Sequence, residues 1–142
     1  MFIQLSSHKQ TTIRYTHMFI ALHRKTQRVL SYYTNGQIRY KAWYKDGCYH
    51  HRIDGPALLK YNETGQIENE TWIENDTYNR IGSAPADISY YENGQIQYEA
   101  WYKDGKLHRP GGVPAVIMYF EDGTIHSVVW YENGRYNYRT LI

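Results

Sequence analysis

The four tryptophans of this 142-residue chain are evenly spaced. Each follows the one before by 29 residues, at Trp43, Trp72, Trp101 and Trp130. The surrounding letters recur with them: residues 90–108 read YYENGQIQYEAWYKDGKLH, and YYTNGQIRYKAWYKDG begins at Tyr32. A fixed period of this length is typical of tandem repeats, in which each unit packs mainly against its neighbours. The sequence therefore predicts a repeat protein.

Each unit contains two stretches in which side chains alternate with a period of 2, and none keeps the helical period of 3.6. The predicted strands are 57–61, 86–91 and 115–120, followed by 66–73, 95–102 and 124–131. The tyrosine content, 16 residues against 3 phenylalanines, suits half-exposed sheet surfaces. We predict an all-β fold, an elongated single-layer antiparallel meander of tandem β-hairpins.

The turn inside each hairpin ends in a glycine. These glycines are Gly36, Gly65, Gly94 and Gly123. A two-residue type I′ turn would also need a positive φ at Thr64, which a β-branched residue resists. The sequence therefore favours a three-residue loop, a type I turn followed by glycine in the left-handed conformation.

This loop predicts a strand register. On one face it pairs Tyr90 with Ile96, Ile88 with Tyr98 and Ala86 with Ala100, and likewise Tyr61 with Ile67 and Tyr119 with Ile125. On the other face it sets Pro56 opposite Trp72, Pro85 opposite Trp101 and Pro114 opposite Trp130. A second turn follows each tryptophan and ends in glycine, except that Asp76 replaces it in the second unit, whose outer turn is expected to be looser.

Two segments are predicted along the chain. Residues 1–30 form an N-terminal cap or a degenerate repeat, in which Tyr15 stands 29 residues before Tyr44. Residues 31–142 form four 29-residue repeats, the last of them truncated. Atypical terminal units are expected where a stack of repeats must close.

Charge is unevenly distributed along the chain. Residues 1–45 carry eight basic and no acidic residues, from Lys9 to Lys45, although the net charge of the whole chain is only +2. Such a front could attract the acidic remainder of the chain or an anionic surface. No signal sequence or membrane span is predicted, and the single cysteine, Cys48, excludes an internal disulfide. We therefore expect a soluble, intracellular protein.

Catalytic, metal and nucleic-acid sites are weakly indicated. A catalytic residue is needed once, whereas nearly every notable residue here recurs with the repeat. His50, His51, His108 and Cys48 do not form a four-ligand zinc set, and the His108-Arg109 pair more plausibly bonds loop carbonyls. Asp87 and Glu99 would be cross-strand partners in the predicted register, but no cleft accompanies them. The basic and aromatic run 39–45 is not repeated, since Glu99 replaces Lys41 in the third unit. We expect no enzyme activity, no cofactor and no metal.

The recurring words YYxNGQIxYxAWYKDGxxHR and DGPA resemble MORN repeats, particularly a longer MORN-like variant found in large DNA viruses of amoebae and in bacterial antitoxin-like proteins. The resemblance covers residues 31–142. It implies successive β-hairpins in a single-layer sheet, and a role in scaffolding, self-association or protein binding. If the chain is viral, host cytoplasm or virion is the implied location.

The expected function is a non-enzymatic module for protein–protein interaction and self-association, with a homodimer protecting its aromatic surface. The candidate contacts are Trp43, Trp72, Trp101, Trp130, Tyr61, Tyr90, Tyr98 and Tyr119. The alternative is a peripheral membrane-surface adaptor that uses the basic front. The sequence leaves open which face or edge is used, and whether the N-terminal segment caps its own stack.

Overall fold

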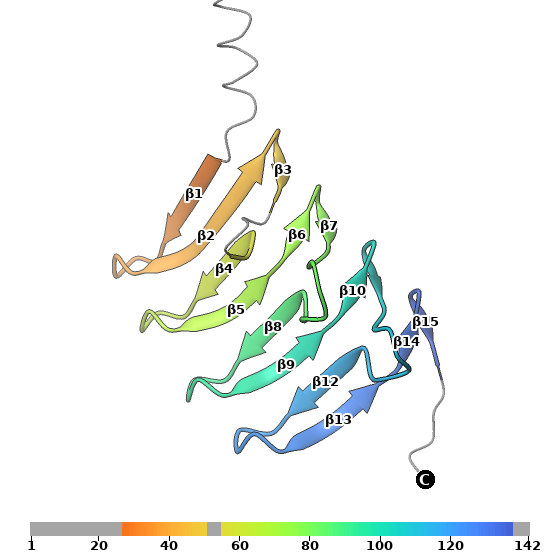
Figure 1. The fold of residues 1–142 in the computed structure, drawn as a ribbon. Helices are drawn as coiled ribbons and strands as arrows, with labels where there is room; N and C mark the ends of the chain where they lie inside the picture. The colour runs from red at the N-terminus through yellow and green to blue at the C-terminus, as the bar shows by residue number, and fades with distance from the viewer. Residues whose placement is uncertain (1–26, 51–54, 138–142) are drawn as a thin grey trace, which may run out of the picture.

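The computed structural model describes residues 27–50 and 55–137, and these are all-β, with strands paired antiparallel and no helix (Figure 1). The predicted all-β class is confirmed. The proposed boundary between residues 30 and 31 falls inside the first strand, β1 (Gln27–Tyr32). The rest of the predicted N-terminal segment, with Lys9 and Tyr15, lies outside the described residues.

Four long hairpins lie side by side in one large sheet (Figure 1). The strands follow one another across the sheet in chain order, β1-β2-β4-β5-β8-β9-β12-β13. After β1 their bounds are β2 (Ile38–Lys45), β4 (Leu58–Tyr61), β5 (Ile67–Thr71), β8 (Asp87–Tyr90), β9 (Ile96–Ala100), β12 (Val116–Tyr119) and β13 (Ile125–Val129).

A short hairpin extends each long one beyond its tryptophan. It comprises the end of β2 with β3 (Cys48–Tyr49), then β6 (Ile73–Glu74) with β7 (Thr77–Tyr78), β10 (Tyr102–Lys103) with β11 (Lys106–Leu107), and β14 (Tyr131–Glu132) with β15 (Arg135–Tyr136). The long second strands expected from the sequence therefore divide at the tryptophans in three units. The Trp101 amide bonds Ala115 of the next unit, whereas the Trp101 carbonyl accepts from His108 of its own short hairpin. The chain changes partner at this residue.

The predicted three-residue loop is present in each long hairpin. In the third, the Tyr91 amide donates to the Gln95 carbonyl at 2.8 Å, and the Gly94 amide donates to the Tyr91 carbonyl at 2.9 Å. Gly94 has a φ of +82°, the left-handed conformation that only glycine adopts without strain. Gly36, Gly65 and Gly123 have φ values of +83°, +87° and +82°.

A second irregularity, which the sequence did not predict, shifts the register beyond this loop. Tyr90 pairs with Ile96 as predicted, but the next pair is Ser89 with Tyr98. Gln97 is an extra residue, a β-bulge, and the same shift occurs in the other three long hairpins. The predicted pairing of Ile88 with Tyr98 is therefore wrong, because Ile88 pairs with Glu99. Ala100 pairs with Asp87, although the Ala86 amide still donates to the Ala100 carbonyl.

The bulge also changes which side chains share a face. Trp72 packs in one cluster with Ala86 and Ile88, and Tyr90 and Ile96 pack against it. The tryptophans therefore lie on the face of the Tyr90–Ile96 pairs, whereas Tyr98 lies on the other face. We call the first the tryptophan face and the second the opposite face. The prediction that prolines and tryptophans share a separate face is wrong, since one extra residue inverts every later side chain.

The outer turns all have the same backbone conformation. Asp104 and Gly105 have φ values of +49° and +74°, which is the pattern of a two-residue type I′ turn. Asn75 and Asp76, at +50° and +58°, adopt it as well. The Asp76 carboxylate accepts a hydrogen bond of 2.7 Å from the Tyr49 amide. This turn, expected to be looser, keeps the conformation of the others and is bonded to the preceding unit.

The core consists of small residues under larger half-exposed ones. Ala42, Ala57, Ala100 and Ala115 are 0% exposed, whereas no large side chain among the described residues is fully buried. No second sheet or helix covers the large sheet within residues 27–50 and 55–137. None of the described residues forms a helix long and apolar enough to cross a membrane.

Candidate functional site

The tryptophans form a row near the junction of the long and short hairpins. Trp43, Trp72 and Trp101 are only 7%, 9% and 6% exposed, and Trp130 is half-buried. The return loops contribute to this burial, because the Trp101 Nε1 donates to the Ser83 carbonyl at 2.8 Å. The first three indoles are therefore the floor of the tryptophan face rather than its outer surface.

An arginine covers two of these indoles. The guanidinium carbon of Arg80 lies 3.5 Å from the centroid of the Trp72 ring, and that of Arg109 lies 3.7 Å from the Trp101 centroid. Each arginine also donates to a proline carbonyl, Arg80 to Pro85 at 2.9 Å and Arg109 to Pro114 at 3.4 Å. Arginine lies against the tryptophan where the predicted register had placed proline. The expectation that the His108-Arg109 pair bonds a loop carbonyl is confirmed for Arg109.

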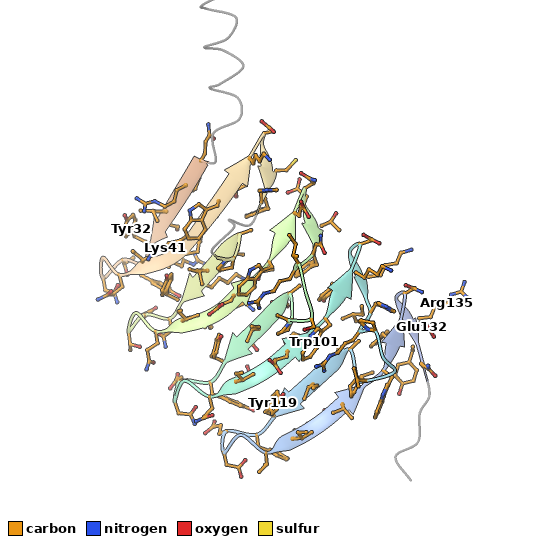
Figure 2. All side chains as sticks on the ribbon, viewed as in Figure 1. Tyr32, Lys41, Trp101, Tyr119, Glu132 and Arg135 are labelled. Carbon is orange, nitrogen blue, oxygen red and sulfur yellow. The ribbon has the colours of Figure 1, made fainter. Side chains whose placement is uncertain are left out.

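Tyrosines and glutamates form the next row outward on the same face. The Tyr90 hydroxyl donates to Glu70 at 3.1 Å, and the Tyr119 hydroxyl donates to Glu99 at 2.7 Å. Burial, followed by interaction with these carboxylates, raises the pKa of Tyr90 and of Tyr119 to about 12. In each pair the tyrosine stands 20 residues after its partner and belongs to the next hairpin. Figure 2 labels Trp101 and Tyr119, which come from adjacent hairpins.

The first hairpin has a variant of this contact. Lys41 occupies the position of Glu70 and Glu99, and its Nζ lies 5.0 Å from the centroid of the Tyr61 ring. The tyrosine row, Tyr61, Tyr90 and Tyr119, is half-buried along its length. Its phenolic rings, with the charged groups beside them, are accessible to a partner. Sequence reasoning missed the arginines and glutamates as members of this surface, although Arg80 and Arg109 recur at the tryptophan spacing.

The opposite face carries Tyr98 and a polar network. Asn69 donates to the Asp87 carboxylate at 2.9 Å and accepts from the Thr71 hydroxyl at 2.8 Å. These three residues line an open hollow of about 480 Å³, together with Lys60 and Tyr78. Because the polar atoms on its floor bond one another, the network primarily stabilises the sheet. The predicted contact residue Tyr98 is thus separated by the sheet itself from Tyr61, Tyr90 and Tyr119.

The structure separates the paired carboxylates considered from the sequence and groups no metal-ligating set among the described residues. Asp87 and Glu99 lie on opposite faces, since Glu99 pairs with Ile88, so they cannot flank one bond. No group of three or more His, Cys, Asp or Glu side chains within residues 27–50 and 55–137 has a metal-binding arrangement. Interaction with Asp76 raises the pKa of the Cys48 thiol, which favours its unreactive protonated form. His51 lies outside the described residues.

The basic front is only partly described. Arg28 and Arg39 are exposed on the first hairpin, and no acidic residue precedes Asp46. Lys9, Arg14, Arg24 and Lys25 lie outside the described residues. Comparison with protein-family models, with curated proteins and with solved structures finds no match to this chain.

Proposed function

We propose that this chain is a non-enzymatic, MORN-like repeat module that binds proteins and associates with itself. The recurring sequence words support the family, and the hairpin architecture agrees with what that family implies. The partners are protein surfaces, a second copy of the chain among them, in a scaffolding role. Neither a cofactor nor a metal enters the proposal.

One observation carries the proposal. The tryptophan face presents half-buried tyrosines and exposed apolar side chains over four hairpins, and no second layer covers them within the described residues. Ile67 and Ile125 on this face are 38% and 59% exposed. Extended surfaces of this kind are typical of repeat proteins that bind partners along their length. Exposed apolar side chains on one face of a sheet are typical of an interaction site.

The geometry refines the contact residues expected from the sequence. Trp43, Trp72 and Trp101 support the surface from below, so a partner reaches them only at their edges. Tyr61, Tyr90 and Tyr119 form the accessible row. Tyrosine and arginine are the residue types enriched at energetically important interface positions. The proposal therefore assigns direct contacts to the tyrosines and to Arg80 and Arg109.

The test is self-association measured by light scattering from micromolar to millimolar concentration, combined with a matched pair of substitutions. Ile67→Ser alters the tryptophan face, and Met118→Ser alters the opposite face at a residue of equal exposure, 38%. Ile67→Ser is expected to weaken association several-fold, and Met118→Ser to leave it unchanged. A strict monomer over the whole range, or equal effects of both substitutions, would contradict the proposal.

A second function, docking on an anionic membrane, is favoured by the charge of the first hairpin. It carries four basic residues, the last of them Lys45, and no acidic residue precedes Asp46 in the sequence. Binding to vesicles that contain anionic lipid would weaken with salt, because counter-ions screen such contacts over about 8 Å at physiological ionic strength. Vesicle binding that resists salt, or no binding, would leave the protein-binding proposal alone.

A further inference from the structure

The large sheet has two outer strands. Among the described residues, β1 pairs only with β2 and β13 pairs only with β12. They belong to the hairpins at the two ends of the row in Figure 1. A sheet edge carries a line of backbone N–H and C=O groups that can pair with another strand. The pairing between neighbouring hairpins inside the chain indicates which register and which side chains a strand paired with β13 would have.

Three internal junctions share one geometry. In each, the second strand of a hairpin pairs antiparallel with the first strand of the next, as β9 pairs with β12. Equivalent positions pair in all three junctions: Ala42 with Leu58, Thr71 with Asp87 and Ala100 with Val116. The neighbouring pairs are also equivalent: Lys41 with Leu59, Glu70 with Ile88 and Glu99 with Ile117. The register of a fourth junction follows by adding the repeat period.

Applied to β13, this register is matched by β1 of a second copy. Val129 then pairs with Val29 of the second copy, and Val128 pairs with Leu30 of the second copy. Val29 is 41% exposed in the single chain. The internal junctions have a charged residue, Lys41, Glu70 or Glu99, at the position of Val128. The terminal strand alone has an apolar residue there, which fits burial against a leucine.

The tyrosine row continues across this junction. Tyr90 lies on Glu70 and Tyr119 on Glu99, each tyrosine reaching back to the hairpin before it. The equivalent pair at the junction is Tyr32 of the second copy on Val128. Tyr32 is 56% exposed in the single chain, and an aromatic ring is well matched to the methyl groups of valine.

The short hairpins also match. Tyr78 stacks on Tyr102 of the next unit with ring centroids 4.6 Å apart. Adding the same spacing to Tyr136, which is 52% exposed, gives Tyr44 of the second copy. The spacing from Lys106 to Gly134 within the chain places Arg135 beside Gly47 of that copy, which follows Asp46 in the sequence. Arg135 and Glu132 lie together on the last short hairpin (Figure 2).

A tyrosine hydrogen bond to the next unit is present at every second long-hairpin turn, and a junction between two copies keeps this alternation. Tyr33 and Tyr91 donate to the carbonyls of Tyr61 and Tyr119 in the next unit, at 2.8 and 2.7 Å. The second and fourth units have Asn62 and Phe120 at this position, and neither has such a bond among the described contacts. A junction from the fourth unit to a first unit is therefore of the same kind as the one from the second to the third.

We propose that β13 of one copy pairs antiparallel with β1 of a second copy, in the register of the internal junctions, so that copies join head to tail. This inference rests on the self-association in the proposed function and adds an edge-to-edge contact to the one on the tryptophan face. The first hairpin carries four basic residues and one acid, and residues 116–137 carry three acids and Arg135, so the two ends attract each other. Because the contact is heterologous, association continues into longer assemblies instead of stopping at a closed dimer.

Cysteine cross-linking in the full chain tests the register. In a Cys48→Ser background, Val29→Cys is made in one protein and Val129→Cys in another of different mass. The equivalent internal pair, Thr71 and Asp87, is a non-hydrogen-bonded position, because the adjacent Trp72 amide bonds the Ala86 carbonyl. Cα atoms at such positions are about 4.5 Å apart, which suits a disulfide. On oxidation, the mixture should give the mixed disulfide and neither protein alone should cross-link.

The matched control replaces Val129→Cys by Ser127→Cys. This residue lies on the same face two positions away, about 7 Å or more from the partner's Val29, and should cross-link several-fold less. Cross-linking of Val129→Cys with itself would show two β13 strands meeting, which overturns the head-to-tail junction. Association without any cross-link overturns the junction but leaves self-association standing. A monomer at all concentrations overturns both.

An edge-blocking variant gives a second measurement. Glu70, the equivalent residue of the second hairpin, directs its backbone hydrogen bonds to the next hairpin. The Val128 amide therefore points away from β12, toward the open edge. Val128→Pro removes this outward donor without taking a bond from the hairpin, and proline is tolerated at sheet edges. Sedimentation velocity should then show at least a tenfold loss of association, while Val128→Thr, which keeps the amide and the shape, should associate as the unsubstituted chain does. Equal association of the two variants would overturn the proposal, provided that circular dichroism shows both folded.

Discussion

The guanidinium carbon of Arg109 lies 3.7 Å from the centroid of the Trp101 ring, and the two residues flank the same short hairpin. The arginine covers the indole and at the same time bonds the Pro114 carbonyl in the return loop. One side chain thus joins the strand, the hairpin and the loop of a unit. Arg80 makes the same contacts with Trp72 and Pro85 in the preceding unit. Arginine stacking is therefore part of the repeated architecture.

Replacing Arg109 with alanine should lower the free energy of unfolding by about 1–2 kcal/mol, since a partly desolvated cation–π contact and a hydrogen bond are lost. Arg109→Lys should recover only part of this loss, because an ammonium lacks the planar stacking surface. Urea unfolding followed by tryptophan fluorescence measures both variants. Equal stability of the lysine variant and the unsubstituted chain would show that charge alone matters.

Alkaline pH should destabilise the fold through Tyr90 and Tyr119. Burial and the neighbouring carboxylates raise the pKa of both hydroxyls from 10.0 to about 12 in the folded chain. Between these pH values the folded chain keeps protons that the unfolded chain releases, so the stabilisation is complete below pH 10 and is lost as pH rises through 12. Titration of tyrosinate absorbance measures the effect. Glu70→Gln should lower the pKa of Tyr90 and leave that of Tyr119 unchanged, because Glu70 contacts only the first of the two tyrosines.

Gly105→Ala should be more destabilising than Gly94→Ala. Both glycines have positive φ, +74° and +82°, so each substitution carries a backbone cost of about 1–2 kcal/mol. A Cβ at Gly105 would also lie 2.8 Å from the Thr77 Cγ2 of the preceding unit, whereas a Cβ at Gly94 meets nothing within 4 Å. Thermal unfolding compares the two. Thr77→Ser, which removes that methyl group, should rescue Gly105→Ala down to the cost of Gly94→Ala, and failure of this rescue would contradict the steric explanation.

Asn93→Asp should separate the two hydrogen bonds of this side chain. Asn93 donates to the Glu121 carbonyl of the next unit at 3.0 Å, and its oxygen accepts from the Gln95 amide at 2.9 Å. Aspartate keeps only the acceptor, as Asp122 does in the last unit with Thr124. Asn93→Asp should therefore cost about 1 kcal/mol, and Asn93→Ala about twice as much. Chemical denaturation measures both, and equal costs would show that the donated bond alone matters.

The sequence predicted the hairpins because the alternation of side chains and the turn glycines are local signals. Gly94 indicated a three-residue loop, and the loop and the Tyr90–Ile96 pair beside it are as predicted. The bulge at Gln97 has no comparable signal, because a polar residue fits a regular strand equally well. Missing it placed Tyr98 on the wrong face and set proline, instead of Arg109, against Trp101.

The candidate surface was predictable in type but not in composition. Regular spacing identified the tryptophans and tyrosines as rows. It could not show that the first three tryptophans are buried, because their burial depends on the return loops and on Arg80 and Arg109. The ladder from Tyr119 to Glu99 likewise depends on the register between hairpins, which no single repeat contains.

The amino-acid sequence by itself determined the repeat period, because the same residues recur along the chain. It also determined the all-β class and the position of every long-hairpin turn, because these depend on residues within a few positions of one another. The tertiary structure decided which side chains share a face, which residue covers each indole and which strands remain at the edges. These depend on one bulge residue per hairpin and on contacts between neighbouring units, where a shift of a single position reverses the direction of every side chain that follows.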